Sequence, residues 1–403
     1  MESIKELYKI GSGPSSSHTI APQRAMKLYM ESNSNANRFI VELYGSLSLT
    51  GKGHFTDHAI KMVCNPFECD VVFKTDCSYS FPSGLIIKGY DHQQELDQWV
   101  VYSLGGGSIK ILNRDYDFQK AVYQEKNLSQ IKEYCNKHNI TYYDYCYQNE
   151  PGLYDYLATI LESMFRAINR GLATEGYLLG PLDMPRIAKK LNENANLLGV
   201  PSDQQNSQLL VSYAYANMEE NGTLGEVVTA PTCGASGIVS SCLYHYHFDL
   251  GHSKQDCINA LATAGIFGNV IKKNATISGA IGGCQAEVGA GCAMAAAAIS
   301  QLINGSLDEI EYAAEIAIEH HLGLTCDPVG GYVIIPCIER NGVASLRARD
   351  AAYMSKSIVN IKKPRVSFDD VVDTMNYTGE KIAIELKETS LGGLANVIKI
   401  GHQ

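Results

Sequence analysis

One segment restricts the possible folds of this chain more than any other feature. Residues 287–304 (EVGAGCAMAAAAISQLIN) are small and apolar on nearly every helical face and include the run Ala295–Ala298. A helix with no polar side must be surrounded by other helices, so we expect it at the centre of a helical body. Gly279 and Gly283, just upstream, would let neighbouring backbone approach closely. Glu287, at the start of the segment, would be stabilised near the helix N-terminus.

The rest of the second half also has helical periodicity. From Leu153 onward the hydrophobic pattern changes to long helical runs, which predicts an all-helical domain over residues 151–403. The predicted helices cover 153–171, 184–192, 203–219, 234–246, 255–272, 287–304, 307–321 and 344–359.

The first part of the chain alternates short strand and helix patterns. Residues 1–112 are therefore predicted to form an α+β domain, with Thr19 as the N-cap of its first helix. Residues 113–150 are polar and tyrosine-rich and are predicted to connect the two domains. The predicted strands are 38–44, 69–73, 84–88 and 99–103, and the predicted helices are 20–31, 56–64 and 128–138.

Composition narrows the class of protein. The chain has 403 residues, enough for two domains, and 45% of them are hydrophobic, as in an ordinary globular protein. A net charge of −10 argues against binding to nucleic acid or an acidic membrane through bulk charge. The N-terminus lacks a signal-peptide pattern, and the most apolar run, 290–303, is too weak for a membrane span. We therefore expect a cytoplasmic protein without nucleic-acid or membrane partners.

Three of the twelve cysteines lie in unusually glycine-rich surroundings. Cys326 and Cys337 lie eleven residues apart within Gly323–Asn341, GLTCDPVGGYVIIPCIERN, and Cys284 lies upstream in GGCQAEVGAGC. Without an export signal, reduced thiols are expected, and soft thiolates suit zinc or an iron–sulfur cluster. Three ligands without a fourth would leave one coordination position open, as in a catalytic site. The alternative is three buried core cysteines.

A second motif, GSGPSSSHT, combines hydroxyls with a histidine near a predicted helix start. Hydroxyl and backbone N–H groups there could form a carboxylate pocket. His18 could accept or donate a proton near neutral pH. The alternative is a serine-rich helix cap beside a solvated histidine.

Two further loops carry candidate site residues. Residues 45–57 (GSLSLTGKGHFTD) place Lys52 and His54 in a glycine-rich loop after a strand, although a flexible surface turn would explain them too. Thr229 opens TAPTCG, which could offer donors to an anion or simply cap a helix. The 45–57 loop and the SSSHT motif belong to the first predicted domain and the three cysteines to the second, so we expect the active site between the two domains.

Four motifs of this chain resemble those of the iron–sulfur L-serine dehydratases, or L-serine ammonia-lyases, in their single-chain form. They are GLTCDPVGGYVIIPCIERN, SGAIGGCQAEVGAGCAMAAAA, VVTAPTCGASG and GSGPSSSHT. The resemblance extends from about Ile4 to about Ala395. It implies a [4Fe-4S] cluster on three cysteines, one iron of which holds no thiolate and acts as a Lewis acid toward the carboxylate and hydroxyl of L-serine. The implied cluster ligands are Cys284, Cys326 and Cys337.

The resemblance also implies how the remaining residues act. His18 or His54 would remove the Cα proton, Thr229 would face the substrate, and the iron would accept the leaving hydroxyl. The product would hydrolyse to pyruvate and ammonia, as in serine catabolism and gluconeogenesis. No pyridoxal phosphate is expected, and a homodimer is implied. The residues implied to seat L-serine are Ser15, Ser16, Ser17, Thr19 and Lys52.

Two other functions remain open at this stage. A cysteine-desulfurising lyase could use the same cluster, and an iron–sulfur redox sensor would need the cysteines but not the histidine loops. The C-terminus departs from the family pattern. After the closing motif Lys387–Ala395 (KETSLGGLA), the chain ends in His402 and Gln403, where many relatives have a terminal cysteine. We expect a solvated tail that does not enter the site.

Overall fold

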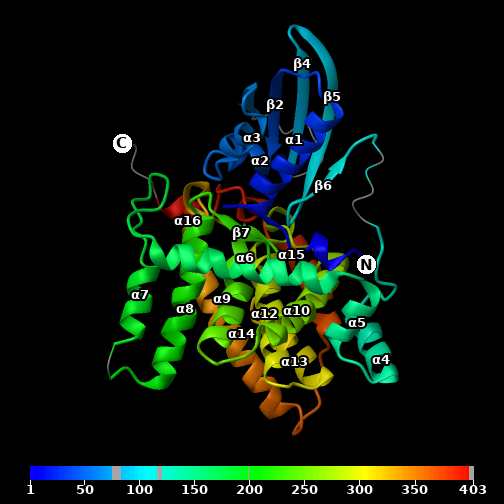
Figure 1. Cartoon of the computed structure of the whole chain (residues 1–403), viewed down its shortest axis with the longest axis vertical. Helices are drawn as coiled ribbons and strands as arrows, with labels where there is room; N and C mark the ends of the chain where they lie inside the picture. The colour runs from blue at the N-terminus through cyan, green and yellow to red at the C-terminus, as the bar shows by residue number, and fades with distance from the viewer. Residues whose placement is uncertain (75–82, 115, 117–119, 198, 399–403) are drawn as a thin grey trace.

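The computed structural model describes residues 1–74, 83–114, 116, 120–197 and 199–398. It consists of a lobe built on a β-sheet that stands on one end of a larger helical body (Figure 1). This arrangement confirms an N-terminal part with strands and helices, followed by a largely helical C-terminal part. Within the described residues, no helix combines the length and hydropathy needed to cross a membrane.

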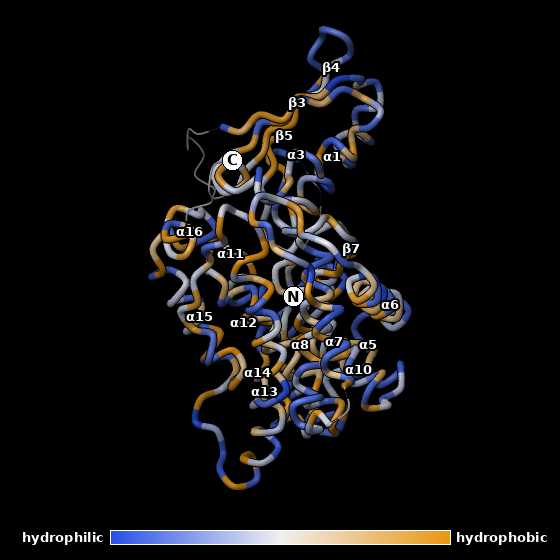
Figure 2. Tube along the Cα trace, turned by 90° about the vertical axis from the view of Figure 1, so that its left-hand side faces the viewer, coloured by the Kyte–Doolittle hydropathy of each residue, from blue (hydrophilic) through white to orange (hydrophobic). Residues whose placement is uncertain are grey.

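The sheet lobe contains five strands in the order β3-β2-β4-β5-β6. β2 and β3 are parallel, and the remaining neighbours are antiparallel. Alternate residues of β2 (Phe39, Val41 and Leu43) are fully buried, as the period of two in the sequence predicts. In Figure 2 the far tip of the β4–β5 hairpin is hydrophilic. The elements of this lobe are β1 (Ile10–Ser12), η2 (Ser16–Ile20), α1 (Ala21–Ser32), β2 (Arg38–Gly45), α2 (Ser46–Leu49), α3 (Thr56–Cys64), β3 (Glu68–Phe73), β4 (Ser83–Asp91), β5 (Gln94–Gly105) and β6 (Ser108–Ile111).

The small apolar segment forms the centre of the helical body, as predicted. It is α12 (Val288–Leu302), of which every residue except Gln301 is buried. α12 packs against four helices. These are α9 (Ser236–Phe248), α10 (Lys254–Asn274), α13 (Leu307–Glu319) and α14 (Cys337–Ile358).

The outer elements of the helical body surround this centre. Among the described residues, four of its α-helices were not predicted from the periodicity: α5, α15 and the short α11 and α16. The remaining elements are η1 (Ile4–Glu6), α4 (Leu128–His138), α5 (Tyr142–Asn149), α6 (Leu153–Ala173), α7 (Ala188–Ala195), α8 (Ser202–Asn221), β7 (Glu226–Val228), η3 (Cys233–Ala235), α11 (Gly279–Gly282), η4 (Cys284–Ala286), η5 (Val329–Gly331), α15 (Phe368–Lys381), η6 (Ile384–Leu386) and α16 (Leu394–Val397).

The chain begins in the helical body before it enters the sheet lobe. Ile4, Leu7 and Tyr8 are fully buried in the main helical core, and the Tyr8 hydroxyl donates to the Leu261 carbonyl at 3.0 Å. β1 then pairs antiparallel with β7 of the helical body. The segment after the sheet returns to the same core, because the buried side chains of α4 and α5 belong to it.

Several local predictions were wrong. The domain predicted as all-helical contains the strand β7 (Glu226–Val228), and the helix predicted at 184–192 is α7 (Ala188–Ala195). The predicted helix 344–359 begins seven residues earlier, at Cys337, because Gly342 lies inside α14 and packs against the Tyr215 ring instead of ending a helix. Thr19 does not cap α1, since its hydroxyl donates to the Ser12 and Ser15 carbonyls at 2.6 and 2.7 Å within the π-helical turn η2.

Candidate functional site

A small cavity of about 20 Å³ lies where the two lobes meet. Its walls come from the turn just before η2, from the loop between α2 and α3, and from loops and helix starts of the helical body. All three predicted cysteine ligands and one predicted histidine line it. The lining residues are Pro14, Ser15, His54, Gly234, Cys284, Glu287, Cys326, Pro328, Val333, Cys337 and Glu388.

The three cysteines reach the cavity from three separate elements. Cys284 begins η4, Cys326 lies in the loop after α13, and Cys337 begins α14. All three are buried, and the described cysteines form no disulfide. The sulfur atoms of Cys284 and Cys326 and a carboxylate oxygen of Glu287 lie within 4.8 Å of one another.

The environment of Cys284 favours a thiolate. A hydrogen bond with the Cys326 thiol and the nearby Arg340 guanidinium lower the pKa of Cys284 to about 6, against the opposing effect of burial. Arg340 is held in place because it donates to the Thr325 carbonyl at 2.7 Å and lies 3.4 Å from Asp327. The site thus contains a soft, negatively charged ligand at neutral pH.

The two predicted histidines lie together beside these cysteines. The rings of His18 and His54 stack with their centroids 4.2 Å apart. His18 Nε2 lies 3.0 Å from the Ser46 carbonyl and His54 Nδ1 lies 2.9 Å from the Thr50 carbonyl. Because a carbonyl can only accept, these two nitrogens carry the hydrogens. His18 Nδ1 and His54 Nε2 are therefore the unprotonated nitrogens of the neutral rings, called the bare nitrogens below.

Both bare nitrogens face the carboxyl group of Glu388. Its Oε1 atom lies 3.6 Å from His18 Nδ1 and 3.8 Å from His54 Nε2. Burial lowers the pKa of His54 to about 4 and that of His18 well below its usual value, so both rings are neutral at pH 7. Burial and the charge of Cys284 raise the pKa of Glu388 to about 8. Glu388 can therefore hold a proton close to both imidazoles.

Backbone pairing fixes Glu388 beside a cysteine 62 positions earlier in the chain. The Glu388 N–H donates to the Cys326 carbonyl at 2.7 Å, and the Cys326 N–H donates to the Leu386 carbonyl at 2.8 Å. Glu388 itself has a φ of 58°, which is strained for a residue with a side chain. The closing motif is thus part of the site.

A glycine allows the His54 loop to reach the helical body. A Cβ atom on Gly53 would lie 2.7 Å from the Gly330 carbonyl and 2.8 Å from that of Gly331. The loop of the sheet lobe therefore lies directly against the loop between Cys326 and Cys337, and only glycine fits this contact.

Some of the other predicted site residues lie around His18, and others do not line the cavity. The Ser17 and Ser15 hydroxyls lie 2.9 and 3.2 Å from His18 Nδ1, and Ser16 and Thr19 are buried in the same turn. Lys52 is exposed, with its Nζ over the Phe73 ring, and it does not line the cavity.

Thr229 also lies away from the cavity lining. Its hydroxyl donates to the Leu7 carbonyl at 2.7 Å and accepts from the Lys9 N–H at 2.8 Å. These bonds attach the N-terminal segment to the helical body. A contact of Thr229 or Lys52 with substrate stays a prediction.

The donor set fits an iron–sulfur cluster, whereas the space between the side chains is small. Such clusters are held by cysteine thiolates, and three buried cysteines line this cavity. A cavity of about 20 Å³ has room for about one water molecule, so the cysteine side chains would have to turn outward to hold a cluster. The tail residues 399–403, which carry our prediction about the C-terminus, lie outside the described part of the chain.

Sequence reasoning missed Arg340 and Glu388 as site residues, although Arg340 lies in the motif of Cys326 and Cys337 and Glu388 lies in the closing motif. Arg340 follows Cys337 by three residues and so projects from the same end of α14. That spacing could have identified it. No comparable signal exists for Glu388, because its neighbour Cys326 is distant in sequence.

Fold and site together define a two-lobed protein with thiols, imidazoles and hydroxyls gathered between its lobes. The family described as serine dehydratase alpha chain matches residues 109–395, and serine dehydratase beta chain matches residues 3–65. L-serine dehydratase 1 of Escherichia coli (strain K12) is 36% identical over 98% of this chain and 99% of its own length. The L-serine dehydratase of Haemophilus influenzae is 35% identical and that of Helicobacter pylori (strain 26695) 34%, with the same coverage of 98% and 99%.

The chain therefore belongs to the serine dehydratase family and joins the alpha- and beta-type regions in a single polypeptide. This confirms the resemblance inferred from the motifs.

Proposed function

We propose that this chain is an L-serine dehydratase that eliminates water from L-serine and releases pyruvate and ammonia. The observation that carries the proposal is that His54 of the sheet lobe, stacked on His18, lines one cavity together with three cysteines of the helical body. Membership of the serine dehydratase family supports the same reaction.

Cys284, Cys326 and Cys337 would hold a [4Fe-4S] cluster at this cavity. When bound, the cluster would supply a Lewis-acidic iron for the carboxylate and hydroxyl of the substrate. The hydrogen bond with Cys326 and the charge of Arg340 lower the pKa of Cys284 and so favour its thiolate form, which metal binding requires.

The residues of the sheet lobe would bind and deprotonate the substrate. The Ser15 hydroxyl lines the cavity and can donate to the substrate carboxylate. His54 Nε2 is bare, faces the cavity and can accept the Cα proton, while the bond from Nδ1 to the Thr50 carbonyl fixes the ring. His18 stacks on His54 and is held by Ser46 and Ser17. Burial of both rings keeps bulk water from protonating them.

Loss of the Cα proton and of the β-hydroxyl yields aminoacrylate and water. Aminoacrylate tautomerises to an imine, which a second water hydrolyses to pyruvate and ammonia. The reaction needs no external oxidant, since the overall change is an elimination followed by hydrolysis.

The proposal is tested by anaerobic turnover assays with L-serine, L-threonine and L-cysteine, together with iron and sulfide analysis. Pyruvate formation from L-serine is expected, whereas sulfide release from L-cysteine alone would indicate a desulfurising lyase. A protein with iron and sulfide but no turnover would indicate a redox sensor.

The cluster ligands are tested separately from activity. Cys284→Ala, Cys326→Ala and Cys337→Ala should each lose iron and sulfide, because three thiolates are the full protein ligand set proposed here. Cys135→Ala should keep both, since Cys135 is buried between α4 and α5 and donates only to the Thr141 carbonyl. Normal cluster content in any of the first three variants would remove that residue from the ligand set.

A further inference from the structure

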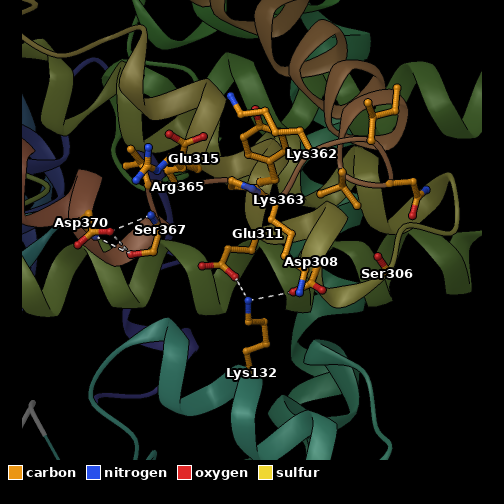
Figure 3. A pocket seen from close by; sticks show the side chains of 16 residues that line it. Lys132, Ser306, Asp308, Glu311, Glu315, Lys362, Lys363, Arg365, Ser367 and Asp370 are labelled. Atoms are coloured by element: carbon orange, nitrogen blue, oxygen red, sulfur yellow. Dashed lines mark hydrogen bonds and ion pairs between the residues drawn. The ribbon is translucent and has the colours of Figure 1, made fainter.

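A second, larger cavity lies far from the candidate site. It has a volume of about 690 Å³ and is lined by α13, α4, the start of α15 and the loop of residues 359–366 (Figure 3). Figure 1 places this loop, at the end of α14, on the end of the helical body farthest from the sheet. α14 begins with Cys337 at the candidate site and ends at Ile358, where this cavity begins.

The floor of this cavity carries two buried carboxylates from α13. Glu311 is 7% exposed and has partners, because it accepts from Lys132 and from the Phe368 N–H. Glu315, one turn further along, is 5% exposed and has neither a hydrogen bond nor an ion pair among the described residues. Burial, together with Glu319 and Glu311, raises its pKa to about 7. An ionised carboxylate in this position lacks a compensating charge, so the group either takes up a proton or pairs with a cation from outside.

The opposite wall carries the complementary charge. Residues 359–366 (VNIKKPRV) place Lys362, Lys363 and Arg365 along the cavity, and Figure 3 shows these side chains around Glu315 and Glu311. None of the three has an ion-pair partner in the described part of the chain. They are therefore available to an anionic group.

The cavity lining also includes apolar side chains. Tyr312, Ile361 and Val366 line the cavity, and Ile361 is 85% exposed. An exposed isoleucine on a loop gains contact area if a ligand with an apolar part enters.

A metal ion fits this arrangement less well than an organic ammonium group. Among the described residues, the groups of three potential metal ligands whose atoms converge within 4.8 Å are His18–His54–Glu388 and Cys284–Glu287–Cys326. The carboxylates of this cavity are not among them. An ammonium group needs a single carboxylate to pair with, which Glu315 supplies.

We propose that this cavity binds a small α-amino acid with an apolar side chain. The ammonium group pairs with Glu315, the carboxylate pairs with Lys362, Lys363 or Arg365, and the side chain lies against Ile361, Val366 and Tyr312. This site goes beyond the proposed dehydratase function and does not depend on it, since the ligand is neither substrate nor product of that reaction.

Calorimetric titration of the anaerobically prepared full-length protein tests the proposal. L-Leucine and L-phenylalanine are the probes, and saturable binding of at least one is expected. N-acetyl-L-leucine lacks the ammonium charge and L-leucinamide lacks the carboxylate. Each should bind at least about tenfold more weakly than L-leucine, because each leaves one charged wall unpaired. If neither probe shows saturable heat, or if both analogues bind as tightly as L-leucine, the proposal is wrong.

Variants locate the binding site. Glu315→Gln and the triple variant Lys362→Gln/Lys363→Gln/Arg365→Gln should each weaken probe binding about tenfold or more. Glu319→Gln, an exposed carboxylate on the same helix, and Lys110→Gln, an exposed lysine on β6, should change it less than about twofold. Thermal unfolding of each variant establishes that it is folded.

One further variant tests whether the probe binds at the candidate active site instead of at the second cavity. His54→Ala should leave probe binding unchanged, because His54 and Cys337 line the candidate site at the start of α14, whereas the proposed binding cavity lies at its end. Binding that disappears in His54→Ala but survives in Glu315→Gln would assign the probe to the candidate active site and overturn the proposal.

Discussion

His54 is the side chain whose surroundings most clearly support a catalytic role. One ring nitrogen is fixed by the Thr50 carbonyl, and the other is bare and faces Glu388 and the cavity. His18 has the same arrangement with the two nitrogens exchanged. Two neutral rings in fixed tautomers are a suitable arrangement for proton transfer.

We predict that His54→Ala lowers kcat for L-serine by about 100-fold or more, because general base catalysis typically contributes that much. Iron and sulfide content should stay normal, since no cluster ligand is changed. His58→Ala is the matched control: this histidine lies four residues away in α3, its side chain is 65% exposed, and it should keep near-normal kcat. Near-normal kcat in both His54→Ala and His18→Ala would exclude the two rings as the base.

The raised pKa of Glu315 predicts how the stability of the protein changes with pH. Its pKa is about 7 in the folded protein, compared with an ordinary value of 4.5. Between these values the unfolded chain has lost the proton that the folded chain retains, so stability falls as pH rises from about 4.5 to about 7 and then levels off.

Glu315→Gln should remove this decrease and make the protein about 1–2 kcal/mol more stable than wild type at pH 8, after allowance for partial solvation. At pH 4.5 the ionisation of Glu315 should contribute little to any difference in the free energy of unfolding between the two proteins. Urea unfolding at several pH values without added amino acids measures the effect. A variant that is less stable than wild type at pH 8 would contradict the buried, unpaired carboxylate.

Individual site residues were predictable from sequence to different degrees. The cysteines, His54 and Ser15 were identified because each lies in a compact motif, and the structure brings them to one cavity. Glu388 was not identified, since its position depends on backbone pairing between segments far apart in the chain. Lys52 and His54 are separated by one residue in sequence, yet their side chains point in different directions, which the sequence does not specify.

At the scale of the elements, close packing of helices depends on small residues. Gly171, near the end of α6, is the clearest case, because a Cβ atom there would lie 2.1 Å from the Ala216 carbonyl of α8. The neighbouring backbone cannot move aside without separating the two helices.

We predict that Gly171→Ala destabilises the protein by about 1–3 kcal/mol despite the better helix propensity of alanine, since overpacking outweighs it. Gly222→Ala is the control, because a Cβ atom there lies 3.4 Å from its nearest neighbour and φ is −66°. Chemical denaturation of both variants measures the difference. Equal stability of the two would show that α6 and α8 can separate without loss.

The elements themselves were predictable where one hydrophobic pattern sufficed. α3 and α4 have the predicted boundaries, and α12 lies at the centre because its composition permits no other place. α14 was shortened in the prediction because a glycine inside a buried helix has the same sequence signature as a glycine that ends one. α5 and α15 carry many polar residues outside their buried side, which obscured their periodicity.

At the scale of the whole molecule, the two lobes depend on each other for the candidate site. The imidazoles come from the sheet lobe and the thiols from the helical body, and the contact at Gly53 joins the loops that carry them. The sequence predicted that the site lies between the two parts. It did not predict that the first residues belong to the helical body, because a short apolar segment can pack equally well in either core.

That N-terminal segment has a consequence for how the two regions are held together. The chain leaves the helical body after Tyr8 and returns near Tyr123, so a single cut between Arg114 and Tyr123 would leave the N-terminal fragment anchored by Ile4, Leu7 and Tyr8 and by the β1–β7 pair. In the uncut chain, the peptide that links the regions would serve as a tether that raises the effective concentration of each region near the other. Fragments joined only by contacts should co-elute in size exclusion and melt at a temperature that rises with protein concentration, whereas the intact chain should not show this dependence. An N-terminal fragment that elutes alone under native conditions would show that the tether, and not the buried segment, holds this protein together.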